Sequence, residues 1–276
     1  MRFVDTYLDV VRLCALDHFD MDVWKEYADR ISPYLYSKVV GDVKDYDFEV
    51  EVLPVVKKAM MNKDLINTIH ENYQIVTQNL NAKFRSCFRK TLDAYVILYL
   101  GLCNGAGWAT SLGTQRVVLI GIEKIIELEW YDKTTLFSLI SHELGHIWHE
   151  EAGGAFGKQN TEKEKAVFQL FSEGIAMRCE QMLCGDDQFY HQDKDGWLSW
   201  CQLHKREIQQ EYLYRVQNGI RIQDFFGDWC AYQGYSAVGY YLGCEFVKHL
   251  MCKQSLKQLA QLNNGEIYNE LVLFVQ

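Results

Sequence analysis

The chain has 276 residues, of which 49% are hydrophobic, 14% aromatic and 24% charged. This composition is that of a globular protein with ample material for a core, and it excludes a largely disordered chain. The net charge of −9 argues against nucleic acid or an anionic membrane surface as a partner, because both attract basic surfaces. Small molecules and peptides are compatible with it.

The cysteines and the N-terminal segment indicate the cellular compartment of the protein. The nine cysteines are odd in number, widely spaced and without a Cys-x-x-Cys pair, which favours free thiols over a disulfide framework. Charged residues, among them Arg2, Asp5 and Asp9, interrupt the apolar stretch that a signal peptide needs. No run of about 18 apolar residues occurs. We expect a cytoplasmic protein that does not bind a membrane.

The first half of the chain changes from helical to β-type patterning. Residues 1–93 are expected to be mostly helical, because DTYLDVVRLCALD (5–17) and DLINTIHENYQIVTQNLNAKF (64–84) repeat apolar residues at three- and four-residue spacing. Two short β-rich runs follow, AYVILYLGLC (94–103) and RVVLIGI (116–122), separated by the glycine-rich NGAGWATSLGT. This order predicts a strand, a loop and a second strand.

Helical spacing returns at Asp132 and continues to the end of the chain. Predicted helices cover 132–151, 161–184, 195–217, 234–252 and a short C-terminal pair, with stops at Gly153-Gly154, Gly185 and Gly265. The order predicts an α+β fold that is mainly helical, with a small sheet before a helical C-terminal part. We divide the chain into a helical N-terminal region, 1–93, and a second domain, 94–276, with no clean linker between them.

The pentapeptide HELGH (142–146) fits the zinc motif H-E-x-x-H. On a helix, His142 and His146 differ by about 40° in azimuth and about 6 Å in rise, so both imidazoles can reach one zinc ion. The alternative is two surface histidines beside a glutamate. The histidines are not needed for packing, because a separate apolar face lies roughly opposite them, formed by Leu136, Phe137, Ile140, Leu144, Ile147 and Trp148.

A catalytic zinc site needs a third protein ligand. His149 stands about 10 Å along the axis from His142, too far to share one ion, so we interpret it as a cleft-lining, outer or exposed polar residue. Glu173 lies in an apolar stripe of the next helix, with Leu170 and Met177 beside it. Such a carboxylate is costly without a cation, and zinc is a suitable one. The alternative is a half-exposed glutamate at a helix edge, while Glu162, Glu164 and Glu180 lie nearer the polar ends of this helix.

Two motifs together resemble a known family. HELGH followed by SEGIA (172–176) on the next helix is similar to the gluzincin metallopeptidases, in which a glutamate supplies the third zinc ligand. YYLGCEFVKHL (240–250) resembles a helix that follows the site in peptidase-MA-like members. The resemblance covers about 94–252 and is closest to predicted zinc-dependent proteases of bacteria. One departure is the 26 residues between His146 and Glu173, more than in thermolysin-like enzymes; we expect the insertion EEAGGAFGKQN (150–160) to reshape a wall of the cleft.

These observations predict a zinc-dependent peptidase acting on a peptide or protein substrate. His142, His146 and Glu173 would hold Zn²⁺, and Glu143 would serve as the general base. A tyrosine would stabilise the oxyanion. The family resemblance implies Tyr240 for that role, and Tyr241 and Tyr235 on the same predicted helix are the alternatives.

Other interpretations stay open at this point. The protein could be a zinc hydrolase of a non-peptide amide or ester, or a non-catalytic protein whose zinc site is closed by His191, Asp193 or His204. RVVLIGI is either an edge strand that pairs with an extended peptide or a buried structural strand. NGAGWAT (104–110) lacks the order of a phosphate-binding loop and is interpreted as a turn between strands.

Overall fold

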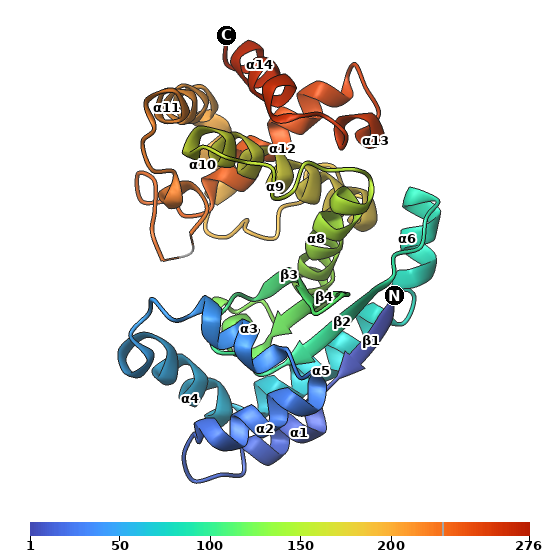
Figure 1. Ribbon diagram of the computed structural model, residues 1–276, viewed down its shortest axis with the longest axis vertical. Helices are drawn as coiled ribbons and strands as arrows, with labels where there is room; N and C mark the ends of the chain where they lie inside the picture. The colour runs from blue at the N-terminus through green and yellow to red at the C-terminus, as the bar shows by residue number, and fades with distance from the viewer. Residues whose placement is uncertain (228) are drawn as a thin grey trace. The chain divides into compact units, whose positions relative to one another are not determined.

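The computed structural model describes residues 1–227 and 229–276 (Figure 1). The chain forms two compact units, Met1–Glu143 and Leu144–Gln276, and the boundary falls inside helix α8, Lys133–Glu151. The first unit contains a small mixed sheet with helices, and the described part of the second is helical. The predicted α+β, mainly helical fold is therefore confirmed. The predicted division into 1–93 and 94–276 stays a prediction, since the two units are defined by compactness alone.

The sheet of the first unit has the strand order β1-β2-β4-β3. Three strands are parallel: β1 (Arg2–Asp5), β2 (Ala94–Tyr99) and β4 (Gln115–Gly121). Strand β3 (Gly107–Leu112) pairs antiparallel with β4 and lies at the edge (Figure 1). Because β4 is paired on both sides, the alternative of a buried structural strand holds for RVVLIGI, and the alternative of a peptide-binding edge strand does not.

Strands β1 and β3 and one helix were missed by sequence patterning. Strand β1 lies in a region expected to be helical; four residues are too few to show a period, and the partner strand comes about 90 residues later. Strand β3 occupies the predicted loop, because a tight hairpin at Gly113 (φ 62°) leads straight into β4. Helix α7 (Ile122–Leu128) follows β4 directly, where no element was predicted.

Along the sequence, most helices of the first unit follow β1 and precede β2. Their bounds are α1 (Tyr7–Leu13), α2 (Met21–Ile31), α3 (Leu35–Asp42), a π-helical turn (Phe48–Val52), α4 (Leu53–Met61), α5 (Lys63–Thr77) and α6 (Leu80–Phe88). Buried aromatic residues fasten two of them to β2 and the residue after it. Trp24 of α2 donates to the carbonyl of Leu100 at 2.9 Å, and Tyr73 of α5 donates to the carbonyl of Val96 at 2.7 Å.

The described part of the second unit consists of helices. After α8 come α9 (Glu162–Cys184), α10 (Trp197–Leu203), α11 (Lys205–Asn218), a 3-10 turn (Gln223–Phe225), α12 (Val238–Met251), α13 (Leu256–Leu259) and α14 (Asn264–Val275). Helix α9 has the bounds expected from its ends: Thr161 and Glu164 form a capping box, and Gly185 ends it in the left-handed conformation at φ 77°.

Three boundaries of the second unit differ from the prediction. The predicted helix 195–217 is two helices, because α10 ends at Leu203 and α11 begins at Lys205. Helix α12 begins four residues late, at Val238, since Ala237 takes the left-handed conformation before it. Gly265 is no stop: Asn263 accepts from its N–H and caps the start of α14.

Two further features of the structure are the length of its apolar helices and the state of its cysteines. Within residues 1–227 and 229–276, the structure contains no helix that is both long and apolar enough to cross a membrane. All nine cysteines are free thiols, as predicted, and four of them are buried: Cys14, Cys179, Cys201 and Cys244.

Candidate metal centre

The HELGH motif lies in the middle of α8. Asp132 caps the start of this helix by accepting from the backbone N–H groups of Thr134 and Thr135 at 2.9 and 3.0 Å. His142 and His146 stand one turn apart, as the H-E-x-x-H spacing requires. His142 is buried, with 3% of its surface exposed, and His146 is half-buried. The alternative of two surface histidines is therefore wrong for His142.

Small residues bring α9 close to α8. A Cβ atom added to Gly145, the glycine of HELGH, would lie 2.9 Å from both the Cα of Ala176 and the Cβ of Cys179. Only glycine leaves room for this approach, because a methyl group at that distance collides. The crossing places the SEGIA segment of α9 beside the histidine face of α8.

The two ring nitrogens of His146 have different neighbours on α9. Its Nε2 atom lies 3.3 Å from Oε2 of Glu173, and its Nδ1 atom lies 3.3 Å from Oγ of Ser172. Glu173 is half-buried, with 17% of its side chain exposed. Its carboxylate thus faces an imidazole across the helix pair.

Of the three residues predicted to hold a metal ion, His146 and Glu173 lie together in the second unit, with Nε2 and Oε2 3.3 Å apart. The third residue, His142, precedes His146 by four positions in the same helix α8. Two imidazoles and one carboxylate are a frequent donor set for catalytic zinc, so these residues fit that ion.

Glu143, the predicted base, lies against the edge strand of the sheet. Its Oε2 atom accepts from the backbone N–H of Ala109 in β3 at 2.8 Å. Gly107 permits this approach, since a Cβ atom there would lie 2.7 Å from Cγ of Glu143. Neither strand residue was predicted, because NGAGWAT was interpreted as a turn. The glycine before an alternating segment was the available signal.

Helix α12 crosses α9 at two glycines and carries Tyr240 one turn before the crossing. A Cβ atom on Gly174 would lie 2.2 Å from the carbonyl oxygen of Gly243. Gly174 follows Glu173 directly, so the crossing also fixes the turn of α9 that bears the carboxylate. Tyr240 is half-buried, and its ring meets Phe226 edge-on at 5.8 Å.

The two alternative tyrosines are engaged in packing. Tyr241 is buried beside Tyr190 and Trp197, with ring centroids 5.9 and 6.5 Å away. Tyr235 precedes α12 and stacks on Trp200 at 4.3 Å, so its predicted place on the helix was wrong. Tyr240 differs from both in lying half-buried on α12 itself.

His149 is a packing residue, and its interpretation as exposed polar surface was wrong. It is fully buried among Phe156, Phe168 and Phe171, and neither ring nitrogen has a hydrogen-bond partner in the described chain. Burial, with a smaller contribution from His146, lowers the pKa of His149 to about 3. The ring is therefore neutral at pH 7, and Phe156 of the predicted insertion covers it.

Glu180 was placed near a polar helix end by the sequence analysis, and the structure contradicts this. Its side chain is fully buried, and both oxygens lie 3.0 Å from Nδ1 of His191. His191 was considered as a fourth zinc ligand. In the second unit its Nδ1 contacts Glu180, and its Nε2 lies 2.9 Å from Nε2 of Gln192.

The other two candidates for a closing ligand have structural contacts. Nδ1 of His204 lies 2.9 Å from the carbonyl oxygen of Trp200, on which the ring also stacks. Asp193 accepts from the backbone N–H of Leu198. Neither belongs to the metal-type groups found among residues 1–227 and 229–276.

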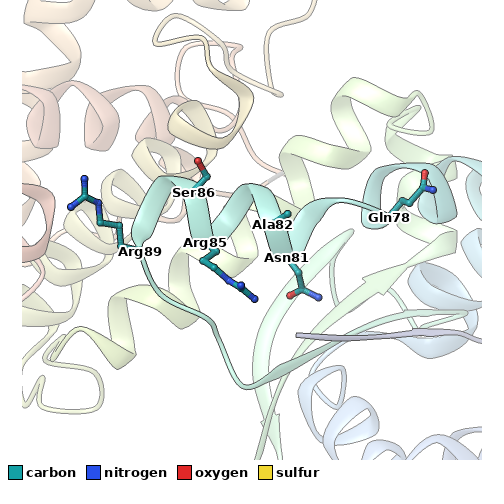
Figure 2. A pocket seen from close by; sticks show the side chains of 6 residues that line it. All are labelled: Gln78, Asn81, Ala82, Arg85, Ser86 and Arg89. Carbon is teal, nitrogen blue, oxygen red and sulfur yellow. The ribbon is translucent and has the colours of Figure 1, made fainter.

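A separate open depression of about 610 Å³ runs along α6 in the first unit. It is lined by Gln78, Asn81, Ala82, Arg85, Ser86 and Arg89. Figure 2 shows that Arg85 and Asn81 point to one side of the helix and Ser86 to the other, so the polar groups do not converge. The depression has no feature of a catalytic centre.

Comparison with protein-family models, curated proteins and solved structures finds no match to this chain.

Proposed function

We propose that this protein is a zinc-dependent peptidase. The observation that carries the proposal is the contact between His146 of the H-E-x-x-H motif and Glu173 of the next helix, whose Nε2 and Oε2 atoms lie 3.3 Å apart. Glu143 lies between the two histidines of the motif and is not needed as a metal ligand. Zinc held by these residues would supply a water molecule of lowered pKa and polarise the scissile carbonyl.

Glu143 would move the proton. Its carboxylate accepts one proton from the attacking water as the new carbon–oxygen bond forms. It returns that proton to the amine nitrogen as the carbon–nitrogen bond breaks, so atoms and charge balance. The hydrogen bond from Ala109 fixes one oxygen of Glu143, which supports a defined position for the other.

Tyr240 would donate a hydrogen bond to the negative charge that develops on the carbonyl oxygen. Its half-exposed hydroxyl-bearing ring and its place one turn from the Gly174–Gly243 crossing support this role. Tyr241 is less suitable because it is buried, and Tyr235 because it lies before the start of α12.

A cytoplasmic location belongs to the same proposal. The free state of all nine cysteines supports it, because disulfides are rare in the cytosol and frequent in secreted proteins. Fractionation of cells that produce the protein at its natural level would test it.

The deciding experiment combines metal content with peptide cleavage. Purified protein should carry close to one zinc per chain and should cleave members of a mixed peptide library, with products identified by mass spectrometry. Glu143→Gln should keep the zinc and lose cleavage, since the amide has nearly the same shape but cannot accept a proton at neutral pH. Ester and non-peptide amide substrates in the same assay distinguish the broader hydrolase, and zinc without any hydrolysis would indicate a structural site.

A further inference from the structure

Glu123 is a fully buried carboxylate that the proposed hydrolysis does not use. It lies in the first turn of α7, two residues after the end of β4. A buried carboxylate is costly unless hydrogen-bond donors surround it, so the fold must supply them. Its donors come from the segment 100–106, which joins β2 to β3.

Two backbone N–H groups of this segment donate to Glu123. Gly101 donates to Oε2 at 2.7 Å, and Cys103 donates to Oε1 at 3.0 Å. The backbone comes very close to the carboxylate, because a Cβ atom on Gly101 would lie 2.6 Å from Oε1 of Glu123. Cys103 takes the left-handed conformation at φ 65°, which is uncommon for a residue with a side chain. Such a conformation persists only where the contacts around it hold it in place.

Further hydrogen bonds fix the end of the segment that precedes β3. The backbone N–H of Gly121, the last residue of β4, donates to the carbonyl of Ala106 at 2.9 Å. The side-chain amide of Asn104 donates to the carbonyl of Val39 in α3 at 3.0 Å. The segment 100–106 is therefore held by α7, β4 and α3 together.

This segment leads directly into the end of β3 that contacts Glu143. Ala109, the third residue of β3, donates to Oε2 of Glu143 at 2.8 Å, and a Cβ atom on Gly107, the first residue, would lie 2.7 Å from Cγ of Glu143. The other end of β3 is fixed by the hairpin at Gly113. The position of the Gly107 end therefore depends on the segment 100–106 as well as on pairing with β4. All of these residues belong to the first unit.

We propose that Glu123 is a positioning residue for Glu143. Its carboxylate holds the segment 100–106, the segment sets the Gly107 end of β3, and Ala109 at that end orients the Glu143 carboxylate. A catalytic group must be held to within about 0.5 Å of its working position, so this support bears directly on proton transfer. The inference rests on the proposed function, in which Glu143 is the base.

Steady-state kinetics on a library peptide that the parent cleaves tests the proposal. The assay is run at pH 8, where the Glu123 carboxylate is ionised, since burial raises its pKa to about 7. Glu123→Gln replaces one acceptor oxygen by an NH₂ group, which cannot accept from a backbone N–H. It should lower kcat by about 10-fold, since a misplacement of about 1 Å can cost about 10²-fold. KM and zinc content should stay near the parental values.

Tyr73→Phe is the matched control for lost stability. It removes a buried hydrogen bond to the carbonyl of Val96 in the same unit and leaves the segment 100–106 untouched. This variant should therefore unfold at lower urea concentration than the parent, with kcat unchanged.

Amide hydrogen exchange at Ala109 provides a readout that does not depend on activity. Its N–H is protected by Glu143 and exchanges when this part of the structure opens locally. Glu123→Gln should speed exchange at Ala109 more than at the amides of β2. Tyr73→Phe should instead speed exchange in β2 and β3 alike, because it lowers the stability of the unit as a whole.

Asn104→Ala provides a second variant that approaches the same segment from α3. Asn104 is partly exposed, so its loss should be tolerated by the fold better than a change at Glu123. It should also lower kcat with KM unchanged and speed exchange at Ala109. This variant decides the matter if Glu123→Gln does not fold.

Three results would overturn the inference. Parental kcat in both segment variants shows that the segment does not position Glu143. Unchanged exchange at Ala109 in both leads to the same conclusion. An equal loss of kcat in Tyr73→Phe assigns the effect to stability alone. If the parent cleaves no peptide, the proposed function fails, while faster exchange at Ala109 in Glu123→Gln still supports the link from Glu123 to Glu143.

Discussion

Oε2 of Glu173 lies 3.3 Å from Nε2 of His146, although 26 residues separate them in the chain. The contact requires α8 and α9 to approach each other closely. The small residues Gly145 and Ala176 at their crossing allow this approach.

Loss of a ligand should lower zinc content. His146→Ala should lose most of the metal, and Glu173→Ala should bind it about 10-fold more weakly or worse. Elemental analysis after gel filtration would measure both. His204→Ala is the control, because this histidine stacks on Trp200 and should leave zinc content unchanged. Unchanged zinc in the Glu173 variant would remove that residue from the site.

Ser172 should influence the metal through His146. Its hydroxyl is the 3.3 Å neighbour of Nδ1, and it favours the tautomer in which Nε2 is free to face Glu173 and a metal. Ser172→Ala should therefore lower zinc affinity by about 10-fold, the smaller end of such effects. Ser138→Ala is a matched control on α8, where a buried hydroxyl donates only to its own helix. Equal affinities in the two variants would contradict the assignment.

Tyr240→Phe should keep zinc and stability but lower kcat by about 10²-fold, the effect of losing one oxyanion donor. KM should change little, because the bond forms mainly in the transition state. The same substitution at Tyr241 and Tyr235 should leave kcat near the parental value. If one of those two loses the rate while Tyr240→Phe retains it, the donor is misassigned.

The crossing of α9 and α12 should not tolerate a methyl group. Gly174→Ala would place Cβ 2.2 Å from the carbonyl oxygen of Gly243, so the helices must separate. We expect a loss of about 3 kcal/mol in the free energy of unfolding by urea, the upper range for overpacking. Gly41→Ala is the control, since that exposed helical glycine has no atom within 4 Å of the added Cβ. It should gain up to about 1 kcal/mol from helix propensity. Similar values for both variants would disprove the close crossing.

Glu123 should make stability fall as pH rises. Burial raises its pKa from 4.5 to about 7, although Gly101 and Cys103 donate backbone N–H groups to it. Because the folded state holds the proton more tightly, this contribution is complete below pH 4.5 and is lost as pH rises through 7. The loss is on the order of 3 kcal/mol.

Urea unfolding between pH 5 and 8 would measure this slope. Glu123→Gln should flatten the slope and lower stability at pH 5, because an amide NH₂ cannot accept from both backbone groups. Glu127→Gln, on the exposed side of the same helix α7, should keep the parental slope. A slope that survives in Glu123→Gln would assign it to another group.

Sequence patterning predicted the elements that local signals define. Helices α8 and α9 have long apolar periods and clear ends, so their bounds were predicted to within one residue. Strand β1 has no such signal, because its stability comes from pairing with β2 at the far end of a helical segment. Pairing across long distances leaves no period in the sequence.

The candidate site likewise contains residues that local spacing predicts and residues that it does not. His142, Glu143 and His146 follow from their spacing on one helix, and their chemical roles stay predictions. Glu180 could not be found, since periodicity does not show that a glutamate near a helix end is covered by a histidine from the next loop. The glycines of HELGH and SEGIA, in turn, are explained by helix packing alone, without any appeal to catalysis.

The contact between Glu143 and Ala109 also bears on self-association. An edge strand offers unpaired backbone groups to any other chain, and a charged side chain placed on that edge discourages such pairing. In β3 one outward N–H is already taken by the Glu143 carboxylate. Glu143→Ala should therefore aggregate more readily than Glu143→Gln, whose amide oxygen can still accept from Ala109. The carboxylate that we propose as a base would thus have a second role, in keeping neighbouring molecules apart.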